Sequence, residues 1–439
     1  MANVSEKRFP RLLIISHNLY DTNNNIGKTL VSLLEGWPKE LISEAYFSND
    51  YPTFKYSNSY YQILDKDVVK SCFSKKTIVG KALEDNNSEQ TEGKALSKLH
   101  AVGNRRIPTV SAIRDLFWKN GKWKTKDFSS WLKNVSKPDL ILFVPNDYCL
   151  AYDVASFVLL NTNATIVPFY MDDAFYYGCR TSFVDWLRRK ALRKKAKLIN
   201  DKSKFIFTIC KAMSLEYEKL FNIKCYDFIN SIELVPSIYK DKKDNNCSFR
   251  FVYSGNLHSN RWRSLVKIAK ALTDINKEKG YSSELIIVTA SNIEPKVLKK
   301  INSIPLIKLK NKVSNEELKE LQFSADILVY AESFKNKDIN NLRLSMSTKI
   351  PEYFRCNAPI FAYGPINLAS IQYFKNEDLA FVCDSKKKNK LKQVLLKSIT
   401  DTASRVRYAE KGLKESIKYN IKERSADFKD MLLSSVGEK

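Results

Sequence analysis

The sequence predicts an α/β protein made of two doubly wound, Rossmann-like domains that face each other across a cleft. Apolar runs typical of buried strands recur along the whole chain, and most are separated by segments long enough for a helix. This alternation favours parallel sheets covered by helices on both faces. The runs begin at residues 11, 139, 164, 204, 249, 284, 325, 358 and 379. A polar, charged run at 240–248 (KDKKDNNCS) divides them into two sets.

The domain boundaries follow from that division. We expect an N-terminal domain over residues 1–239, a linker over 240–248 and a C-terminal domain over 249–410, followed by helices over 411–439. A chain of 439 residues is long enough for two or three domains. Ligands of doubly wound sheets bind beyond the carboxyl ends of the strands. The residues directly after each apolar run are therefore the first candidates for a binding site.

The chain is strongly basic, with 73 Lys and Arg against 48 Asp and Glu and a net charge of +25. Such an excess favours a polyanionic partner, which leaves nucleic acid, an anionic membrane and phosphorylated substrates open. Two segments, 105–128 and 183–204, combine basic residues with aromatic and aliphatic ones at helical spacing. Segment 183–204 is either an amphipathic helix on a membrane surface or a solvated helix that packs one stripe on the core. In 105–128, Trp118 and Trp123 among lysines suit the headgroup zone of a membrane, and nucleic acid could use the same mixture. No nucleic-acid module is recognisable by motif, so we expect no nucleic-acid partner.

Cysteine and histidine usage argues against metal binding and disulfides. The eight cysteines show no C-x-x-C spacing and there are three histidines, which predicts a reducing compartment and no metal site. No apolar run approaches the ~20 residues that span a bilayer. The apolar stretch near the N-terminus is too short for a signal peptide and suits a strand better. We therefore expect a cytoplasmic protein.

The stretch SHNLYDTNNNIGKTL, residues 16–30, contains part of a phosphate-binding P-loop. Gly27, Lys28 and Thr29 match the end of that motif, but Thr22 stands where its first glycine is required. We therefore favour a first strand-to-helix turn with Gly27 near the helix start. An anion could still bind there, because helix N-termini attract negative charge.

Two stretches of the second half combine phosphate-binding features. Gly255 follows the run at 249, and a helix is expected to begin near Arg261, so free amides and a guanidinium coincide. The alternative is a helix start whose arginines are merely solvated. In STKIPEYF, Ser347 or Thr348 could cap a helix with Glu352 in its first turns. A capping box leaves Lys349 unexplained, since the helix dipole disfavours a cation there and a bound diphosphate would offset that cost.

The order of these motifs resembles that of GT-B glycosyltransferases, and the closest likeness is to family 4-like enzymes of bacterial surface-polysaccharide synthesis. The matching stretches are SHN…GKTL, FYMDDAFYYG, YSGNL…RW and STKIPEYF…APIFAYGP, so the similarity covers nearly the whole chain. The resemblance implies that the C-terminal domain holds a nucleotide sugar. It also implies that the C-terminal helices cross back to the N-terminal domain.

The resemblance assigns roles to individual residues. The donor-binding set would be Gly255, Asn256, Arg261, Ser347, Thr348, Lys349 and Glu352. Glu352 would accept hydrogen bonds from the ribose hydroxyls, and the others would contact the diphosphate. The loop residues Asn25, Gly27 and Lys28 would line the cleft. Asp172, followed by Asp173, stands where many relatives carry a histidine near the reacting centre, so the catalytic set would be Asp172, Arg261 and Lys349.

The chain also departs from the family pattern. Relatives often carry two glutamates eight positions apart, but Leu344 stands eight residues before Glu352. The acid that touches the donor sugar would then be Glu332 or Asp338, or would be absent. Asn256 stands where an arginine is common. These departures leave the donor and the stereochemistry open.

The resemblance implies a retaining glycosyltransferase that needs neither metal nor cofactor, because positive charge stabilises the leaving diphosphate. It would transfer a sugar from a nucleotide diphosphate sugar to a lipid-linked or glycan acceptor, at an anionic membrane surface on the cytoplasmic side. The alternatives are a nucleic-acid-binding or P-loop nucleotide-binding protein and a catalytically silent GT-B partner subunit.

Overall fold

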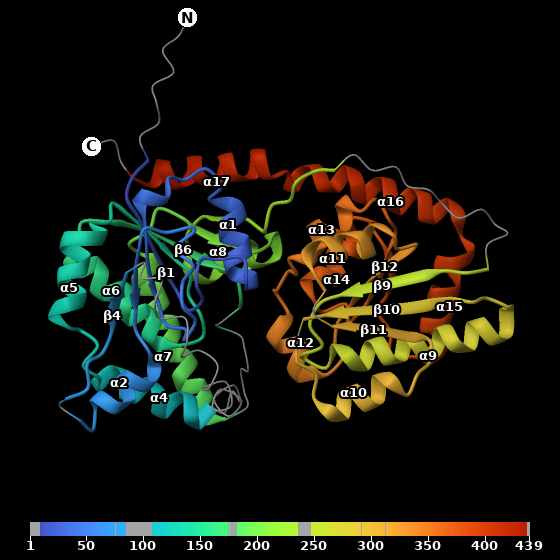
Figure 1. Ribbon diagram of the computed structural model, residues 1–439, viewed down its shortest axis with the longest axis horizontal. Helices are drawn as coiled ribbons and strands as arrows, with labels where there is room; N and C mark the ends of the chain where they lie inside the picture. Colours follow the sequence, from blue (N-terminus) through green and yellow to red (C-terminus); the bar gives the residue numbers. More distant parts are fainter. Residues whose placement is uncertain are drawn as a thin grey trace, which may run out of the picture. The chain divides into compact units, whose positions relative to one another are not determined.

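The computed structural model describes residues 9–74, 76–84, 108–173, 175, 182–235, 247–290, 292–311 and 313–436. The chain divides into two compact units (Figure 1). Unit 1 comprises Met1–Asn230 together with Lys422–Lys439, and unit 2 comprises Ser231–Ile421. Most of the expected linker, residues 240–246, lies outside the described residues.

Unit 1 is built on an eight-stranded sheet of order β4-β3-β2-β1-β5-β6-β7-β8. Its strands are β1 Leu12–Ser16, β2 Ile42–Tyr46, β3 Ser59–Gln62, β4 Lys81–Leu83, β5 Leu140–Phe143, β6 Thr165–Tyr170, β7 Ile206–Thr208 and β8 Cys225–Asp227. Its strand pairs are parallel except for β3 with β4. The direction in which the chain adds strands reverses at β1, so the carboxyl ends of β1 and β5 form a topological switch point.

The helices of unit 1 begin and end as the local sequence dictates. They are α1 Asn25–Leu33, α2 Asp65–Ser71, α4 Pro108–Asn120, α5 Lys126–Trp131, α6 Cys149–Asn161, α7 Phe183–Asn200, α8 Lys211–Phe221 and α17 Ile421–Ser435, with short helical turns at Lys39–Leu41 and Leu132–Ser136. Thr125 and Ser182 cap α5 and α7 through their side-chain oxygens. Phe428 of α17 is fully buried in this unit, with its ring centroid 4.7 Å from that of Phe207 and 5.0 Å from that of Phe228.

Unit 2 has a six-stranded parallel sheet of order β11-β10-β9-β12-β13-β14. Its strands are β9 Arg250–Ser254, β10 Glu284–Thr289, β11 Ile307–Asn311, β12 Ile327–Ala331, β13 Ile360–Tyr363 and β14 Phe381–Cys383. Its helices are α9 Arg261–Lys279, α10 Pro295–Asn302, α11 Asn315–Phe323, α12 Asn336–Leu342, α13 Lys349–Arg355, α14 Ala369–Asn376, α15 Lys388–Thr400 and α16 Thr402–Ser416, followed by a turn at Ile417–Tyr419. Its switch point lies between β9 and β12.

Successive residues of β9 belong to different apolar cores, because side chains alternate across a strand. Phe251 and Tyr253 pack in one core, whereas Val252 packs in the other. Both faces of the sheet are therefore covered, as in the doubly wound sheets that the sequence predicts. All nine apolar runs lie in strands, which confirms the predicted fold class.

The two basic segments form helices, but several side chains that the membrane interpretation would place on the surface are buried. Trp118 and Trp123 are buried, and so are Arg188 and Arg189 of α7. Arg188 donates from Nε to Asp115 Oδ2 at 2.7 Å, so it holds α7 against α4 and does not face solvent. None of the described helices is long and apolar enough to cross a bilayer.

Candidate functional site

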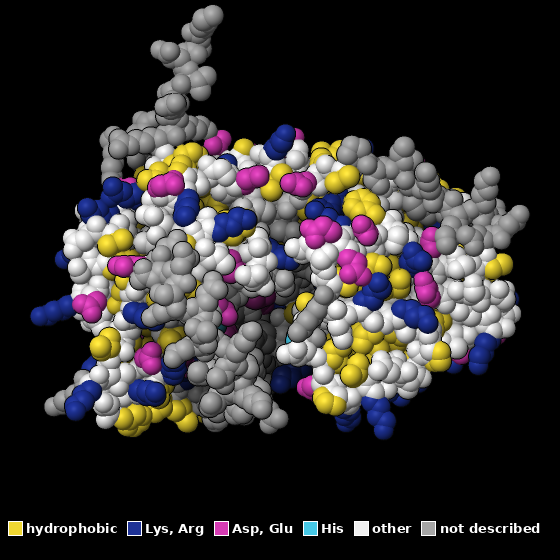
Figure 2. Space-filling model, in the orientation of Figure 1, with side chains coloured by type: hydrophobic (Ala, Val, Ile, Leu, Met, Phe, Trp, Pro, Cys, Tyr) yellow, Lys and Arg dark blue, Asp and Glu magenta, His cyan; other side chains and the backbone are white. Residues whose placement is uncertain are grey.

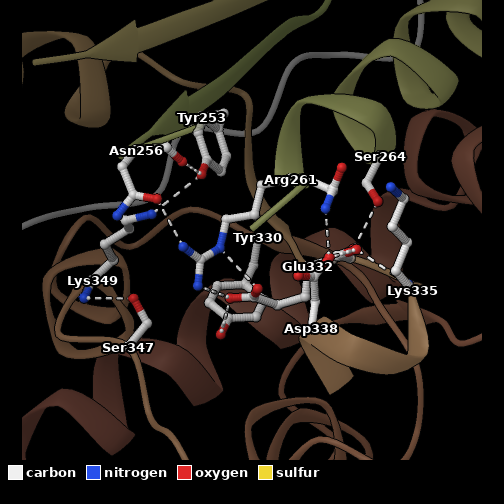
Figure 3. A network of polar contacts seen from close by, with 12 residues as sticks. Tyr253, Asn256, Arg261, Ser264, Tyr330, Glu332, Lys335, Asp338, Ser347 and Lys349 are labelled. Carbon is white, nitrogen blue, oxygen red and sulfur yellow. Dashed lines mark hydrogen bonds and ion pairs between the residues drawn. The ribbon is translucent and has the colours of Figure 1, made fainter. Parts of the chain in front are cut away.

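The polar residues of unit 2 gather at the switch point between β9 and β12, where ligands of such sheets bind. Gly255 directly follows β9, and Glu332 directly follows β12. Figure 3 shows Arg261 of α9 between Asn256 and Glu332, with Lys349 of α13 on the Asn256 side. The predicted residues Gly255, Asn256, Arg261 and Lys349 are thus brought together.

Gly255 is required by the geometry of this turn. Its φ is +147°, and its N–H donates to the Val288 carbonyl at 2.8 Å. A Cβ at this position would lie 1.8 Å from Nζ of Lys349, so the missing side chain leaves room for that ammonium group. The β9–α9 turn and the start of α13 are therefore fitted to each other.

Arg261 is the first residue of α9 and forms a two-pronged ion pair with Glu332. Its Nε donates to Oε2 at 2.8 Å and its Nη2 to Oε1 at 3.0 Å, while Nη1 donates to Asn256 Oδ1 at 2.8 Å. Burial alone would lower the pKa of Arg261, but the Glu332 carboxylate outweighs it and raises that pKa. Within the described residues three of the five N–H groups are used, which leaves two for a ligand.

Lys349 is a second cation at the same place and begins α13. Its Nζ donates to the Tyr253 hydroxyl at 3.5 Å and lies 4.7 Å from the centroid of that ring. Burial, and then the charge of Arg261, lower the pKa of Lys349 to about 7. A desolvated ammonium at a helix N-terminus beside a guanidinium is unfavourable in the free protein. The arrangement becomes favourable when an anion binds between the two cations.

The start of α13 does not form the capping box that was the structural alternative. Thr348 occupies the N-cap position without a side-chain cap, and Ser347 Oγ only accepts a long bond of 3.4 Å from the Lys349 N–H. Glu352 is half-buried, and its carboxylate has no hydrogen-bond partner among the described residues. The carboxylate is therefore free to meet a ligand.

Both acids considered for the donor sugar, Glu332 and Asp338, form hydrogen bonds within the protein. Glu332 is held by Arg261 and also accepts from the Tyr330 hydroxyl at 3.1 Å. Asp338 is buried and accepts from Ser333 Oγ at 2.6 Å and Asn260 Nδ2 at 2.9 Å. Tyr353 fixes α13 on the strand ends, since its hydroxyl accepts from the Ser254 N–H at 3.0 Å.

The loop before α1 is closed by its own side chains. The Gly27 N–H donates to Asn24 Oδ1 at 2.8 Å, and the Asn23 N–H donates to Asp21 Oδ1 at 2.8 Å. A Cβ at Gly27 would lie 2.1 Å from the Asp21 carbonyl oxygen, so glycine is needed for packing. Amides that a P-loop would turn toward phosphate are occupied, which argues against that motif. Asn25 and Lys28 are exposed.

The acidic pair after β6 separates into two roles. Asp173 is buried and accepts from the Tyr217 hydroxyl at 3.1 Å, so it is a structural residue. Asp172 is exposed. The YYG part of the matching stretch that follows lies outside the described residues.

Unit 1 has a polar cluster at its own switch point that sequence reasoning missed. His17 follows β1, Tyr148 lies just before α6, and the Arg114 guanidinium stacks 4.1 Å from the centroid of the Tyr148 ring. Arg114 Nε donates to Asp65 Oδ1 at 2.8 Å. Burial, and then Arg114, lower the pKa of His17. The rule that ligands bind after strand ends could have singled out His17 and Tyr148.

No protein family and no curated protein matches this chain by sequence. Solved structures do match over nearly the full length. Anabaena HepE in complex with UDP-glucose has a TM-score of 0.58 at 12% identity, covering 96% of this chain and 99% of that one. A glycosyltransferase from Rickettsia africae has a TM-score of 0.56 at 12% identity, covering 98% of each chain. An E. coli trehalose-6-phosphate structure bound with UDP-2-fluoro glucose has a TM-score of 0.59 at 10% identity, covering 96% and 99%. The chain therefore has the GT-B fold of two Rossmann-like units that these proteins share.

Proposed function

We propose that the protein is a glycosyltransferase that uses a nucleotide diphosphate sugar as donor. The observation that carries the proposal is the convergence of Arg261, Lys349 and the first turns of α9 and α13 on one switch point. Two cations and two helix N-termini form a site for a diphosphate. The bound UDP-glucose of Anabaena HepE, a structural neighbour, supports this choice of ligand.

The same groups would supply the chemistry. Negative charge develops on the diphosphate as the bond to the sugar breaks, and preorganised cations stabilise it without a metal ion. Lys349 and the two remaining N–H groups of Arg261 would do so, with Gly255, Ser347 and Thr348 beside them. Glu352 would accept hydrogen bonds from the ribose. The transfer would proceed with retention, as the resemblance implies.

The acceptor would be a lipid-linked or glycan molecule of surface-polysaccharide synthesis. The β1–β5 cluster of unit 1 offers His17, Arg114 and Tyr148 together with Asp65, a mixture of donors and acceptors suited to sugar hydroxyls. Asp172 is proposed as a further residue of the acceptor side. A catalytically silent subunit is the second candidate, because Leu344 is buried where relatives carry a glutamate.

Thermal shift with nucleotide diphosphates tests donor binding. A ligand at 100 times its dissociation constant stabilises the native state by about 2.7 kcal/mol, so a shift with UDP, GDP or ADP is expected. Absence of any shift, and of competition by nucleotide sugars, would contradict the proposal. Release of free nucleotide from the matching nucleotide sugar then separates an enzyme from a silent subunit.

Glu352→Gln is expected to weaken nucleotide-diphosphate binding by about 1–3 kcal/mol, because charge-assisted bonds to the ribose are lost. The melting temperature should hardly change, since the carboxylate has no hydrogen-bond partner among the described residues. Isothermal titration calorimetry measures the affinity, and Glu410→Gln on the exposed side of α16 is the matched control. Unchanged affinity together with lower stability would assign Glu352 to the helix alone.

A lipid-linked acceptor would bring the enzyme to the inner face of the cell membrane, and unit 1 offers a face for that. Phe183, Trp186 and Leu187 of α7 are 72%, 51% and 46% exposed, with Lys190 and Lys194 exposed on the same helix. Ile113 and Leu116 of α4 are 53% and 60% exposed. Figure 2 shows hydrophobic and basic side chains next to each other at the lower end of this unit, where Figure 1 places α2 and α4. Tryptophan, aliphatic residues and lysine together suit the headgroup zone.

Binding to anionic liposomes is therefore expected, weakened but not abolished by high salt, because insertion of apolar side chains is not screened. Trp186→Ser with Leu187→Ser should reduce binding at least tenfold in a sedimentation assay. Leu160→Ser, which removes a leucine that is 86% exposed on α6, should leave it unchanged. Equal binding by all three proteins would place the contact elsewhere, and no binding at low salt would favour a soluble glycan acceptor.

A further inference from the structure

A pocket of about 610 Å³ lies between α4 and α7 in unit 1. It adjoins the cluster at the β1–β5 switch point, since Trp118 of its lining donates from Nε1 to Asp65. Its apolar lining comes from both helices and from the segment after α4: Ala112, Leu116, Trp118, Trp123, Val184, Leu187 and Ala191. Its volume falls within the range of sites that hold small molecules.

Some charged side chains around the pocket form ion pairs and others do not. Asp115 is paired with Arg188, and Asp153 is paired with Lys195, so both acids of the lining are neutralised. Lys119 and Lys124 also line the pocket, are exposed, and form no ion pair within the described residues. The rim therefore carries a net positive charge above an apolar interior.

The pocket is continuous with the exposed apolar face of α7. Leu187 belongs to both, being 46% exposed and also part of the lining. Phe183 and Trp186, stacked at 5.8 Å between ring centroids, precede it on the same helix. A molecule that extends out of the pocket therefore meets further apolar surface and then the lysines of α7.

We propose that the α4–α7 pocket binds one hydrocarbon chain of a phosphate-bearing lipid, with the phosphate at Lys119 and Lys124. The chain fills the apolar interior, and the two ammonium groups pair with the head group. The proposal adds a lipid-binding site to the membrane association proposed above. It rests on the proposed function only for the idea that the bound lipid is the acceptor. Its physical basis, an apolar interior under a basic rim, holds for any lipid of that chemistry.

Quenching of tryptophan fluorescence by brominated lipids tests chain entry directly. Trp118 and Trp123 are buried at the pocket, whereas Trp186 lies outside it on the exposed face. In a Trp186→Phe variant, bromines on the acyl chain of phosphatidylglycerol are expected to quench the remaining fluorescence. Further replacement of both lining tryptophans, Trp118 and Trp123, by Phe should remove most of that quenching. Quenching that disappears completely with Trp186→Phe would mean that the lipid stays at the surface, and would overturn the proposal.

Monomeric alkyl phosphates test the hydrocarbon-chain contact and the phosphate contact independently. Affinity for hexyl, octyl and decyl phosphate should rise about fourfold per added methylene, as expected for burial of about 0.8 kcal/mol each. Decanol should bind at least tenfold more weakly than decyl phosphate, and inorganic phosphate should not compete. No dependence on chain length, or equal binding of decanol, would overturn the proposal.

Two variants test the apolar interior and the basic rim separately. Ala191→Phe, on the exposed side of α7, fills the pocket and should abolish decyl phosphate binding while nucleotide binding in unit 2 persists. Lys119→Gln with Lys124→Gln should remove the preference for the phosphate and keep the chain-length dependence. If Ala191→Phe instead changes the molecular mass in solution and leaves decyl phosphate binding intact, the pocket is covered by a second copy of the chain and the lipid proposal fails. Loss of nucleotide binding in all variants would concern the proposed donor site and not this pocket.

Discussion

Lys349→Met is expected to lower the affinity for a nucleotide diphosphate by roughly 10- to 150-fold, since a hydrogen bond to a charged group contributes about 1.5–3 kcal/mol. The same variant should raise the melting temperature, because it removes a buried ammonium that lies beside Arg261. Lower stability of the free protein together with higher affinity for the ligand is the pattern expected when a residue serves binding. Calorimetry and thermal unfolding measure the two effects, and Lys267→Met on the exposed side of α9 is the control.

The pH dependence gives an independent test of the same residue. Because the pKa of Lys349 is lowered to about 7 and the diphosphate binds its charged form, affinity should be flat below pH 7 and should fall up to tenfold per pH unit above it. The free energy of unfolding should change with pH in the opposite direction to the affinity. Between pH 7 and the ordinary lysine pKa the unfolded chain holds a proton that the native state has released, so stability rises with pH. Both slopes should be absent in Lys349→Met, and their persistence would place the titrating group elsewhere.

Glu332→Ala is expected to destabilise unit 2 by about 3–5 kcal/mol, because it leaves the guanidinium of Arg261 without its carboxylate in a place where that side chain is only 13% exposed. Urea unfolding measures the change. Glu284→Gln removes the partner of Arg250 in a more exposed pair and should cost less than 1 kcal/mol.

A second substitution distinguishes support of the fold from support of the ligand. Arg261→Met combined with Glu332→Leu should recover most of the stability, since no charge is then left buried. Nucleotide-diphosphate binding should stay lost in this double variant. Recovered stability with recovered binding would remove Arg261 from the proposed donor site. Failure to recover stability would mean that Arg261 or Glu332 stabilises unit 2 through contacts other than their ion pair.

The strands could be predicted from the sequence where burial and composition agree. The nine apolar runs became strands, but β2, β3, β4, β8 and β11 were not predicted. In β2 the buried positions include Ser43 and Glu44, which break the apolar pattern. Glu44 is tolerated there because it accepts the Tyr20 N–H at 2.9 Å, and burial raises its pKa. A polar residue satisfied by a distant partner carries no local signal.

The residue cluster that we propose as the donor site could be predicted in part for a similar reason. Glycine, helix start and basic residue lie within a few positions of each other for Gly255 and Arg261, so local rules single out these two residues. The Arg261–Glu332 pair joins residues 71 positions apart and became visible only in the structure. The face of α7 proposed for membrane contact shows a further limit. Helical spacing places residues on common faces but does not say which face is buried, and for α7 the buried one contains Arg188 and Arg189.

The fully buried Phe428 of α17 has a consequence for synthesis on the ribosome. The rings that it contacts, Phe169, Phe207 and Phe228, belong to segments made some 200 to 260 residues earlier, as the sequence numbers show. At about 5–20 residues per second, this aromatic cluster waits for at least ten seconds with one side uncovered. Unit 2 is complete in sequence before unit 1 is. The first unit to emerge is thus the last to close, and a nascent chain stalled before α17 should present that cluster to chaperones.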